Sequence, residues 1–171
     1  EVLPAGECNY IMGNPPFVGY SLQSKEQKAD MLDIYVDEKG KSYKTAGKID
    51  YVAGWYFKAA EYIQNTGVRT AFVSTNSITQ GEQVAAVWKP LYDRFGIHID
   101  FAWRTFKWDS ESTEKAAVHV VIIGFSNEKT TSEYRLYSTP TQSNICENIS
   151  PYLVDAPNMF IEARTKSLCN V

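Results

Sequence analysis

Hydrophobic and polar positions alternate along the chain with two periods, which together predict the order of strands and helices. Short apolar runs bounded by turn residues predict strands at residues 8–12, 68–74, 97–103, 117–125 and, more weakly, 134–137. Apolar residues at every third or fourth position predict helices at residues 24–35, 50–65 and 82–95. Strands separated by helices predict an α/β fold with mostly parallel pairing. The last two strong strands lack a helix between them and are expected to pair antiparallel.

Residue types that commonly cap helices lie at the ends of these predicted helices. Ser24 and Asp50 precede the first and second helices and are the expected N-caps, while Gly67 and Gly96 follow the second and third. Pro90 lies inside the third helix and is expected to kink it.

The helical spacing also predicts which side chains face the core. Ala29, Leu32 and Tyr35 share one face of the first helix, and Trp55 and Trp88 lie on apolar stripes, so these residues are assigned to the interior. Residues 37–48 are polar and rich in lysine, and they predict a loop.

Two polar clusters follow predicted parallel strands. The NPPF segment (Asn14-Pro15-Pro16-Phe17) follows the first strand, and the TNS turn (Thr75-Asn76-Ser77) follows the second. Paired prolines end the strand and stiffen the backbone, so the NPPF segment presents one carboxamide and one ring from a rigid loop. Ligands of open α/β sheets bind beyond the carboxyl ends of the strands. The two clusters are therefore either one binding site or two unrelated turns.

Composition narrows the class of protein. The 171 residues suffice for one domain with a core, and the net charge of −3 argues against broad electrostatic capture of nucleic acid without excluding a specific site. Three dispersed cysteines and two histidines argue against a zinc site and favour a reducing, cytoplasmic setting. The longest apolar run, residues 116–125, is too short for a membrane span, and no signal peptide is visible.

Nearly the whole chain resembles the methyltransferase region of large single-chain restriction–modification enzymes that methylate the exocyclic amine of adenine. The resemblance lies in MGNPPFVGYSLQSKEQKADM, DYVAGWYFKAAEYI, RTAFVSTNSITQGEQV, FAWRTFKWDSESTEKAAVHVVIIGF and ISPYLVDAPN. The NPPF motif by itself is less specific, because enzymes that methylate RNA guanine or protein glutamine carry it too.

The resemblance implies a chemistry for the NPPF segment. The Asn14 side-chain oxygen and the Pro15 carbonyl would accept the two amine hydrogens of a flipped adenine in double-stranded DNA, and Pro16 would keep the loop rigid. Phe17 would stack on the base. S-adenosylmethionine would donate the methyl group, with no metal required.

Other residues receive weaker assignments. The TNS turn either shapes the adenine pocket or is a plain turn. Arg104, Lys107 and Trp108, the basic aromatic group, are expected in a loop, where they either contact DNA or the flipped base or are simply solvated. Asp50 is either a contact to cofactor or base or only a helix cap.

The resemblance also implies a partial Rossmann-like methyltransferase fold. Related enzymes place a glycine-rich cofactor loop before the NPPF strand, whereas this chain contains no Gly-x-Gly and its N-terminal cofactor-loop half is missing. Residues 1–139 are then the catalytic half, and residues 140–171 an irregular extension leading toward an absent target-recognition domain. An isolated fragment is expected to be inactive and to self-associate, most simply as a dimer. The alternatives are a methyltransferase for RNA guanine or protein glutamine, and a non-catalytic binding or scaffold module.

Overall fold

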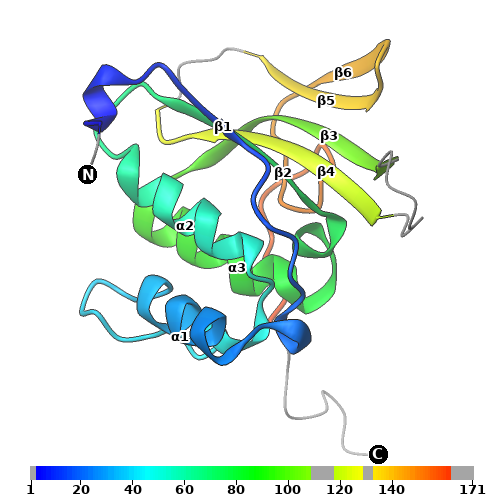
Figure 1. Cartoon of the computed structure of the whole chain (residues 1–171). Helices are drawn as coiled ribbons and strands as arrows, with labels where there is room; N and C mark the ends of the chain where they lie inside the picture. The colour runs from blue at the N-terminus through cyan, green and yellow to red at the C-terminus, as the bar shows by residue number, and fades with distance from the viewer. Residues whose placement is uncertain (1–2, 109–117, 129–132, 163–171) are drawn as a thin grey trace, which may run out of the picture.

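The computed structural model describes residues 3–108, 118–128 and 133–162, which form a six-stranded sheet with three helices on one side (Figure 1). The helices are α1 (Lys25–Ile34), α2 (Val52–Tyr62) and α3 (Gly81–Phe95). The strands are β1 (Tyr10–Gly13), β2 (Arg69–Thr75), β3 (His98–Trp108), β4 (Val118–Ser126), β5 (Tyr134–Thr139) and β6 (Gln142–Cys146). Short 3₁₀ turns are η1 (Ala5–Glu7), η2 (Tyr20–Leu22), η3 (Ala46–Lys48) and η4 (Asn76–Thr79). The expected α/β class is confirmed.

The strands follow the order β1-β2-β4-β3-β5-β6 across the sheet. β1 is parallel to β2 and β3 is parallel to β5, whereas β4 is antiparallel to both β2 and β3, and β6 is antiparallel to β5. Four strands therefore share one direction, and the antiparallel pairing expected for the last two strong strands is confirmed. The carboxyl ends of β1, β2 and β3 lie on one side of the sheet, called here the carboxyl edge.

One predicted strand was too short, and one strand was not predicted. β3 continues to Trp108, beyond the expected end at residue 103, because Phe106 and Trp108 pair with β4 after a bulge. The basic aromatic group therefore lies in a strand and not in the expected loop. β6 occupies part of the segment expected to be irregular, and its buried Cys146 pairs with Tyr134 of β5.

Capping explains where the helices begin and end. Ser24 forms the expected N-cap of α1: its hydroxyl accepts from the Gln27 N–H at 3.2 Å, and the Gln27 side chain accepts from the Ser24 N–H at 3.0 Å. Gly96 ends α3 with a left-handed φ of 61°. The expected capping of α2 by Asp50 was wrong, because Tyr51 is the N-cap and no side chain caps this helix.

The core lies between the helices and the facing side of the sheet. The ring of Tyr56 on α2 contacts Phe72 of β2 at 5.3 Å and Phe125 of β4 at 5.4 Å, between centroids. Trp88 of α3 is fully buried, as expected, and its indole N–H donates to the Ile78 carbonyl at 2.8 Å. Aromatic rings of this size supply much of the apolar area that stabilises a small domain.

On α1 and α2, some residues that were predicted to face the core are exposed. Trp55, assigned to the core, is 49% exposed, because it lies with Tyr51 and Lys58 on the outer stripe of α2. On α1 the fully buried side chain is Met31, whereas Leu32 and Ala29 are exposed. Spacing alone did not fix which of two adjacent stripes faces the core.

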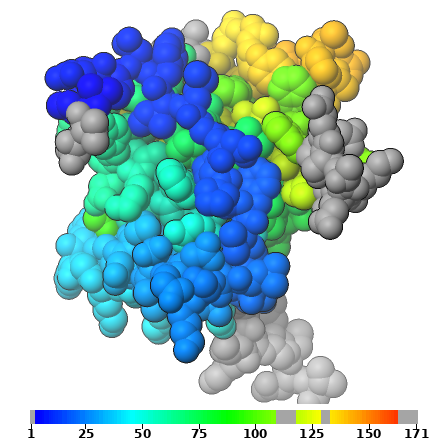
Figure 2. Space-filling view, viewed as in Figure 1, coloured from blue at the N-terminus to red at the C-terminus, as the bar shows by residue number. Residues whose placement is uncertain are grey.

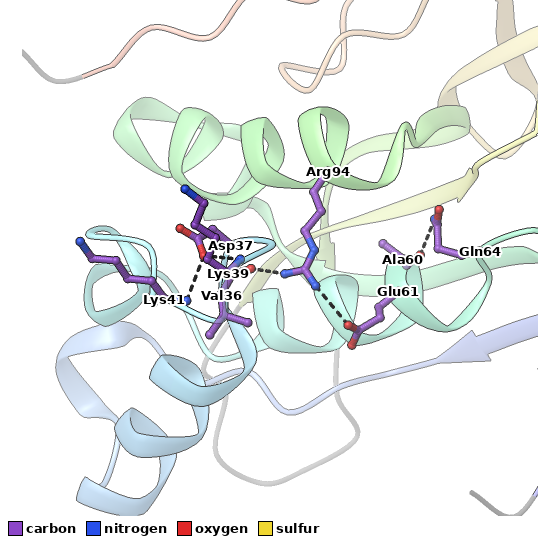
Figure 3. A network of polar contacts seen from close by, with 8 residues as sticks. All are labelled: Val36, Asp37, Lys39, Lys41, Ala60, Glu61, Gln64 and Arg94. Atoms are coloured by element: carbon purple, nitrogen blue, oxygen red, sulfur yellow. Dashed lines mark hydrogen bonds and ion pairs between the residues drawn. The ribbon is translucent and has the colours of Figure 1, made fainter.

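Polar contacts join the three helices on the side away from the sheet (Figure 3). Arg94 of α3 donates to the Val36 carbonyl in the loop after α1, and it pairs with Glu61 of α2 at 3.4 Å. In the same loop, Asp37 Oδ1 accepts from the N–H groups of Lys39 and Lys41 at 2.9 Å each. The loop between α1 and α2 is thus tied down independently of the carboxyl edge.

β1 is the outermost strand on one flank of the sheet, and its residues lie at the surface (Figure 2). The described C-terminal residues do not cover it. They run along the α3 side, where Phe160 contacts the Tyr92 ring at 5.5 Å between centroids. No helix in the described part of the chain is long and apolar enough to cross a membrane.

Candidate active site

The NPPF segment leaves the sheet at the end of β1. Gly13, the last residue of β1, pairs with Phe72, and a Cβ added at Gly13 would lie 3.2 Å from the Phe72 ring. In the segment that follows, Pro15 is buried and Phe17 is half-buried, whereas Asn14 is exposed. The carboxamide is therefore presented to solvent from a loop whose next residue is anchored in the protein.

The TNS turn leaves the sheet at the end of the neighbouring strand. β2 ends at Thr75, and η4 begins at Asn76. The hydroxyl oxygens of Thr75 and Ser77 lie 2.9 Å apart. Because β1 and β2 are adjacent and parallel, the NPPF segment and the TNS turn meet at the carboxyl edge, which confirms their expected convergence.

Asp50 joins the loop after the NPPF segment to the TNS turn. Its Oδ1 accepts from the backbone N–H of Tyr20 at 3.0 Å, and its Oδ2 accepts from the Ser77 hydroxyl at 2.5 Å. The side chain is buried, with 6% of the residue exposed. A carboxylate held by two protein donors offers little free surface to a cofactor, so the observed geometry gives Asp50 a bridging position.

The basic aromatic group also reaches the carboxyl edge. Thr75 pairs with Val120, which in turn pairs with Phe106 of β3. Two strand spacings separate β3 from β2, a distance of about 10 Å. Lys107 and Trp108 follow Phe106 and extend past that level. The group is thus on the same edge as the NPPF segment, with β2 and β4 between β1 and β3.

The members of the basic aromatic group differ in surroundings. Arg104 Nε donates to the Leu153 carbonyl at 3.2 Å, so this side chain turns toward the C-terminal segment. Trp108 belongs to a row of rings, with Phe106 at 6.3 Å and then Trp103 at 6.0 Å between centroids. Tyr137 of β5 stacks on Trp103 at 5.5 Å.

Sequence reasoning missed part of this arrangement. The row of rings could have been found from the aromatic residues of FAWRTFKW, which are two positions apart in each half of the segment and continue past residue 103. The bridging contacts of Asp50 had no local signal, because its partners Tyr20 and Ser77 lie 30 and 27 residues away.

A cleft of about 590 Å³ opens between α3 and the segment from Tyr43 to Lys48. Positive and negative charges along its lining cancel, because the charged residues there are Lys44, Lys48 and Lys89 against Glu82, Asp93 and Glu162. A groove that follows a nucleic-acid backbone carries an excess of positive charge. The carboxyl edge is therefore the better candidate for the reacting base.

Comparison with known proteins identifies the family of this chain. The sequence profile of the family described as MmeI, DNA-methyltransferase domain, matches residues 2–138. DNA methyltransferase A of Bacillus subtilis (strain 168) is 43% identical over 173 residues, which cover 100% of this chain and 19% of that protein. A solved structure described as the Type IIL restriction–modification enzyme MmeI in complex with DNA superposes with a TM-score of 0.89 at 44% identity, over 99% of this chain and 23% of that one. The chain thus spans about a fifth of the length of these relatives. It belongs to the MmeI family of DNA methyltransferase domains.

Proposed function

We propose that the chain is the catalytic part of an adenine-N6 DNA methyltransferase within a longer restriction–modification polypeptide. The observation that carries this proposal is the position of the NPPF segment. It leaves β1 at the carboxyl edge, beside the TNS turn of β2, in a chain of the MmeI methyltransferase family. Double-stranded DNA is the proposed partner, and the described complex of the relative with DNA supports that choice.

The proposed chemistry explains how the adenine amine, a weak nucleophile, can accept a methyl group. The amine of adenine donates its lone pair into the ring, so it attacks a methyl group slowly. The Asn14 side-chain oxygen and the Pro15 carbonyl would accept its two hydrogens and stabilise the positive charge that develops on the nitrogen. The buried Pro15 and the rigid Pro16 keep these acceptors in place, so little reorganisation is needed during transfer.

The target base must leave the duplex to reach these acceptors. Phe17 is half-buried and would offer one ring face to the flipped adenine, a contact worth about 1–3 kcal/mol. The TNS turn, Lys107 and Trp108 would border the base or the DNA from the same edge, and Arg104, held by Leu153, would act mainly through its charge.

S-adenosylmethionine is the proposed methyl donor of the whole enzyme. This chain would contribute little to its binding, because the sequence has no Gly-x-Gly loop and the carboxylate of Asp50 is engaged by Tyr20 and Ser77. The cofactor would bind mainly to regions outside this chain, which by itself would be inactive and would associate with a second copy. The enzyme would act in the cytoplasm, where its DNA substrate lies.

The test incubates the complete polypeptide and isotopically labelled S-adenosylmethionine with duplex DNA, RNA or protein in separate reactions. Nucleosides from the nucleic acids and peptides from the protein are separated, and the labelled species are identified by mass spectrometry. Labelled N6-methyladenine that disappears with Asn14→Ala supports the proposal. Label found only in RNA guanine or in protein glutamine would favour the corresponding NPPF enzymes, and no transfer to any substrate would favour a binding or scaffold role.

A further inference from the structure

Three segments that are distant in the sequence meet at Asp50. The first is the loop after the NPPF segment, whose Tyr20 N–H donates to Oδ1 at 3.0 Å. The second is the TNS turn, whose Ser77 hydroxyl donates to Oδ2 at 2.5 Å. The third is the start of α3, where the Gln83 side-chain oxygen accepts from the Asp50 N–H at 3.2 Å. Each carboxylate oxygen thus holds one of the two loops that end at the carboxyl edge.

Because Asp50 is buried, its carboxylate depends on hydrogen-bond donors from the protein. No lysine or arginine in the described part of the chain forms an ion pair with Asp50, although the residue is only 6% exposed. A buried carboxylate without a cation is unfavourable unless donors satisfy it, and here the donors are Tyr20 and Ser77. Conversely, removal of the carboxylate takes the acceptor from the Tyr20 N–H and breaks the bond from the Ser77 hydroxyl, which can then donate to Thr75.

The contacts around Asp50 that do not use its carboxylate would hold the fold if that carboxylate were removed. The Tyr51 N–H donates to the Val18 carbonyl at 2.9 Å, and the Gln23 side chain donates to the Ile49 carbonyl at 2.9 Å. These bonds keep the loop after the NPPF segment near α2. Among the hydrogen bonds of the described residues, those of the carboxylate are the ones that link that loop to the TNS turn.

We infer that Asp50 is a positioning residue that fixes the NPPF segment and the TNS turn relative to each other through its two carboxylate oxygens. This inference rests on the proposed function, since it assumes that both segments border the reacting base. Asp50 acts by holding the segments in place and needs no contact with base or cofactor. Reacting groups that lie about 1 Å out of place lose roughly 100-fold in rate.

Two substitutions in the complete polypeptide separate positioning from charge. Asp50→Ala removes both acceptors and should lower kcat for methyl transfer by roughly 10- to 100-fold, with a smaller effect on KM. Asp50→Asn loses the charge but keeps the link: its oxygen accepts from Tyr20, and its amide donates to Ser77 Oγ, which then donates to Thr75. Asparagine should therefore restore most of kcat.

Asp37→Ala is the matched control. Asp37 also accepts from two donors, the N–H groups of Lys39 and Lys41, but it lies in the loop between α1 and α2 (Figure 3). Its loss should leave kcat unchanged. A 2-aminopurine placed at the target position reports the flipped base by fluorescence, and this signal should change with Asp50→Ala and not with Asp37→Ala.

The outcomes decide the inference separately from the proposed function. A kcat for Asp50→Ala equal to that of Asp37→Ala overturns it, and so does an Asp50→Asn variant as slow as Asp50→Ala, because charge would then be the essential property. If Asp50→Ala does not fold, Ser77→Ala takes its place: a reduced kcat supports the link, and an unchanged kcat overturns it. The proposed function fails on different grounds, namely wild-type enzyme that does not form N6-methyladenine.

Discussion

Gly13 at the end of β1 lies against the ring of Phe72 on β2, so close that a Cβ on Gly13 would be 3.2 Å from the Phe72 Cε1 atom. This contact sets how near the start of the NPPF segment comes to the core. Gly13→Ala should push the strand end and the ring apart by a few tenths of an ångström and slow methyl transfer by the complete enzyme, roughly tenfold.

Gly6→Ala is the control for this substitution, because a Cβ at Gly6 meets nothing within 4 Å. Initial rates of label transfer to duplex DNA compare the two variants. Equal rates would mean that the spacing between Gly13 and Phe72 has no influence on the site.

Asn14→Ala should reduce methyl transfer by the complete enzyme on the order of 100-fold or more, because one preorganised acceptor is lost. Asn14 is exposed, so the thermal unfolding midpoint should not change. Asn144→Ala, at an exposed position of β6, provides the control for removal of a carboxamide. Turnover near that of the wild type by folded Asn14→Ala would remove this residue from the mechanism.

Phe17→Ala should slow methyl transfer less than Asn14→Ala. Its proposed role is to stack on the flipped base, and stacking contributes about 1–3 kcal/mol. Single-turnover rates for both variants, measured at saturating DNA, give the comparison. If Phe17→Ala is the slower of the two, stacking is not its main contribution.

Local sequence patterns predicted the helices and strands well, but they predicted the tertiary contacts of individual residues less well. The period of apolar residues found all three helices, and Ser24 and Gly96 marked real helix ends, because caps depend on residues a few positions apart. Asp50 has the side chain of a cap, yet tertiary donors at Tyr20 and Ser77 bind its carboxylate. Whether Asp50 caps the helix or accepts from distant donors depends on the folded structure, so a short stretch of sequence does not predict it.

Prediction of the candidate active site was also limited by features that depend on the folded structure. Parallel pairing of β1 and β2 made the meeting of the NPPF segment and the TNS turn predictable, since strand direction follows from the helix between them. The extent of β3 was harder to predict, because a bulge between Trp103 and Phe106 shifts the alternation of its side chains. Burial of Trp88 but not Trp55 depended on how each helix is rotated against the sheet.

Alkaline conditions should destabilise the 171-residue chain through its buried tyrosines. Burial raises the pKa of Tyr56 above its ordinary value of 10.0, although the Ser74 hydroxyl at 2.7 Å partly opposes the shift, and burial raises the pKa of Tyr35 as well. These phenols stay protonated in the folded chain at a pH where the unfolded chain ionises. Their contribution to stability is thus complete below pH 10 and declines as the pH rises above it.

Tyr56→Phe tests this pH dependence, because phenylalanine keeps the ring and cannot ionise. The free energy of unfolding in urea should fall less steeply above pH 10 in this variant than in the wild type. Tyr10→Phe, at an exposed position, should not alter the slope. Parallel curves for the wild type and Tyr56→Phe would show that ionisation of this phenol is not linked to unfolding.

Self-association of the isolated chain should proceed through the open flank of β1. This outermost strand has one sheet partner, β2, and its Tyr10 and Met12 are 68% and 80% exposed. Unpaired backbone groups beside apolar side chains form a template for a second strand, most simply from another copy related by a two-fold axis. Because the described C-terminal residues pack along α3, they leave this flank open.

A lysine on the strand should block that pairing, because a charge on an outermost strand opposes the approach of another. Sedimentation velocity of the isolated chain should show a species above the 19.3 kDa monomer, and Met12→Lys should return it to the monomer. Met159→Lys places the same charge at a methionine that is 62% exposed but lies outside the sheet, and it should leave the assembly intact. A wild-type chain that remains monomeric at high concentration would contradict the prediction, and dissociation by both substitutions would assign the effect to net charge instead of to β1.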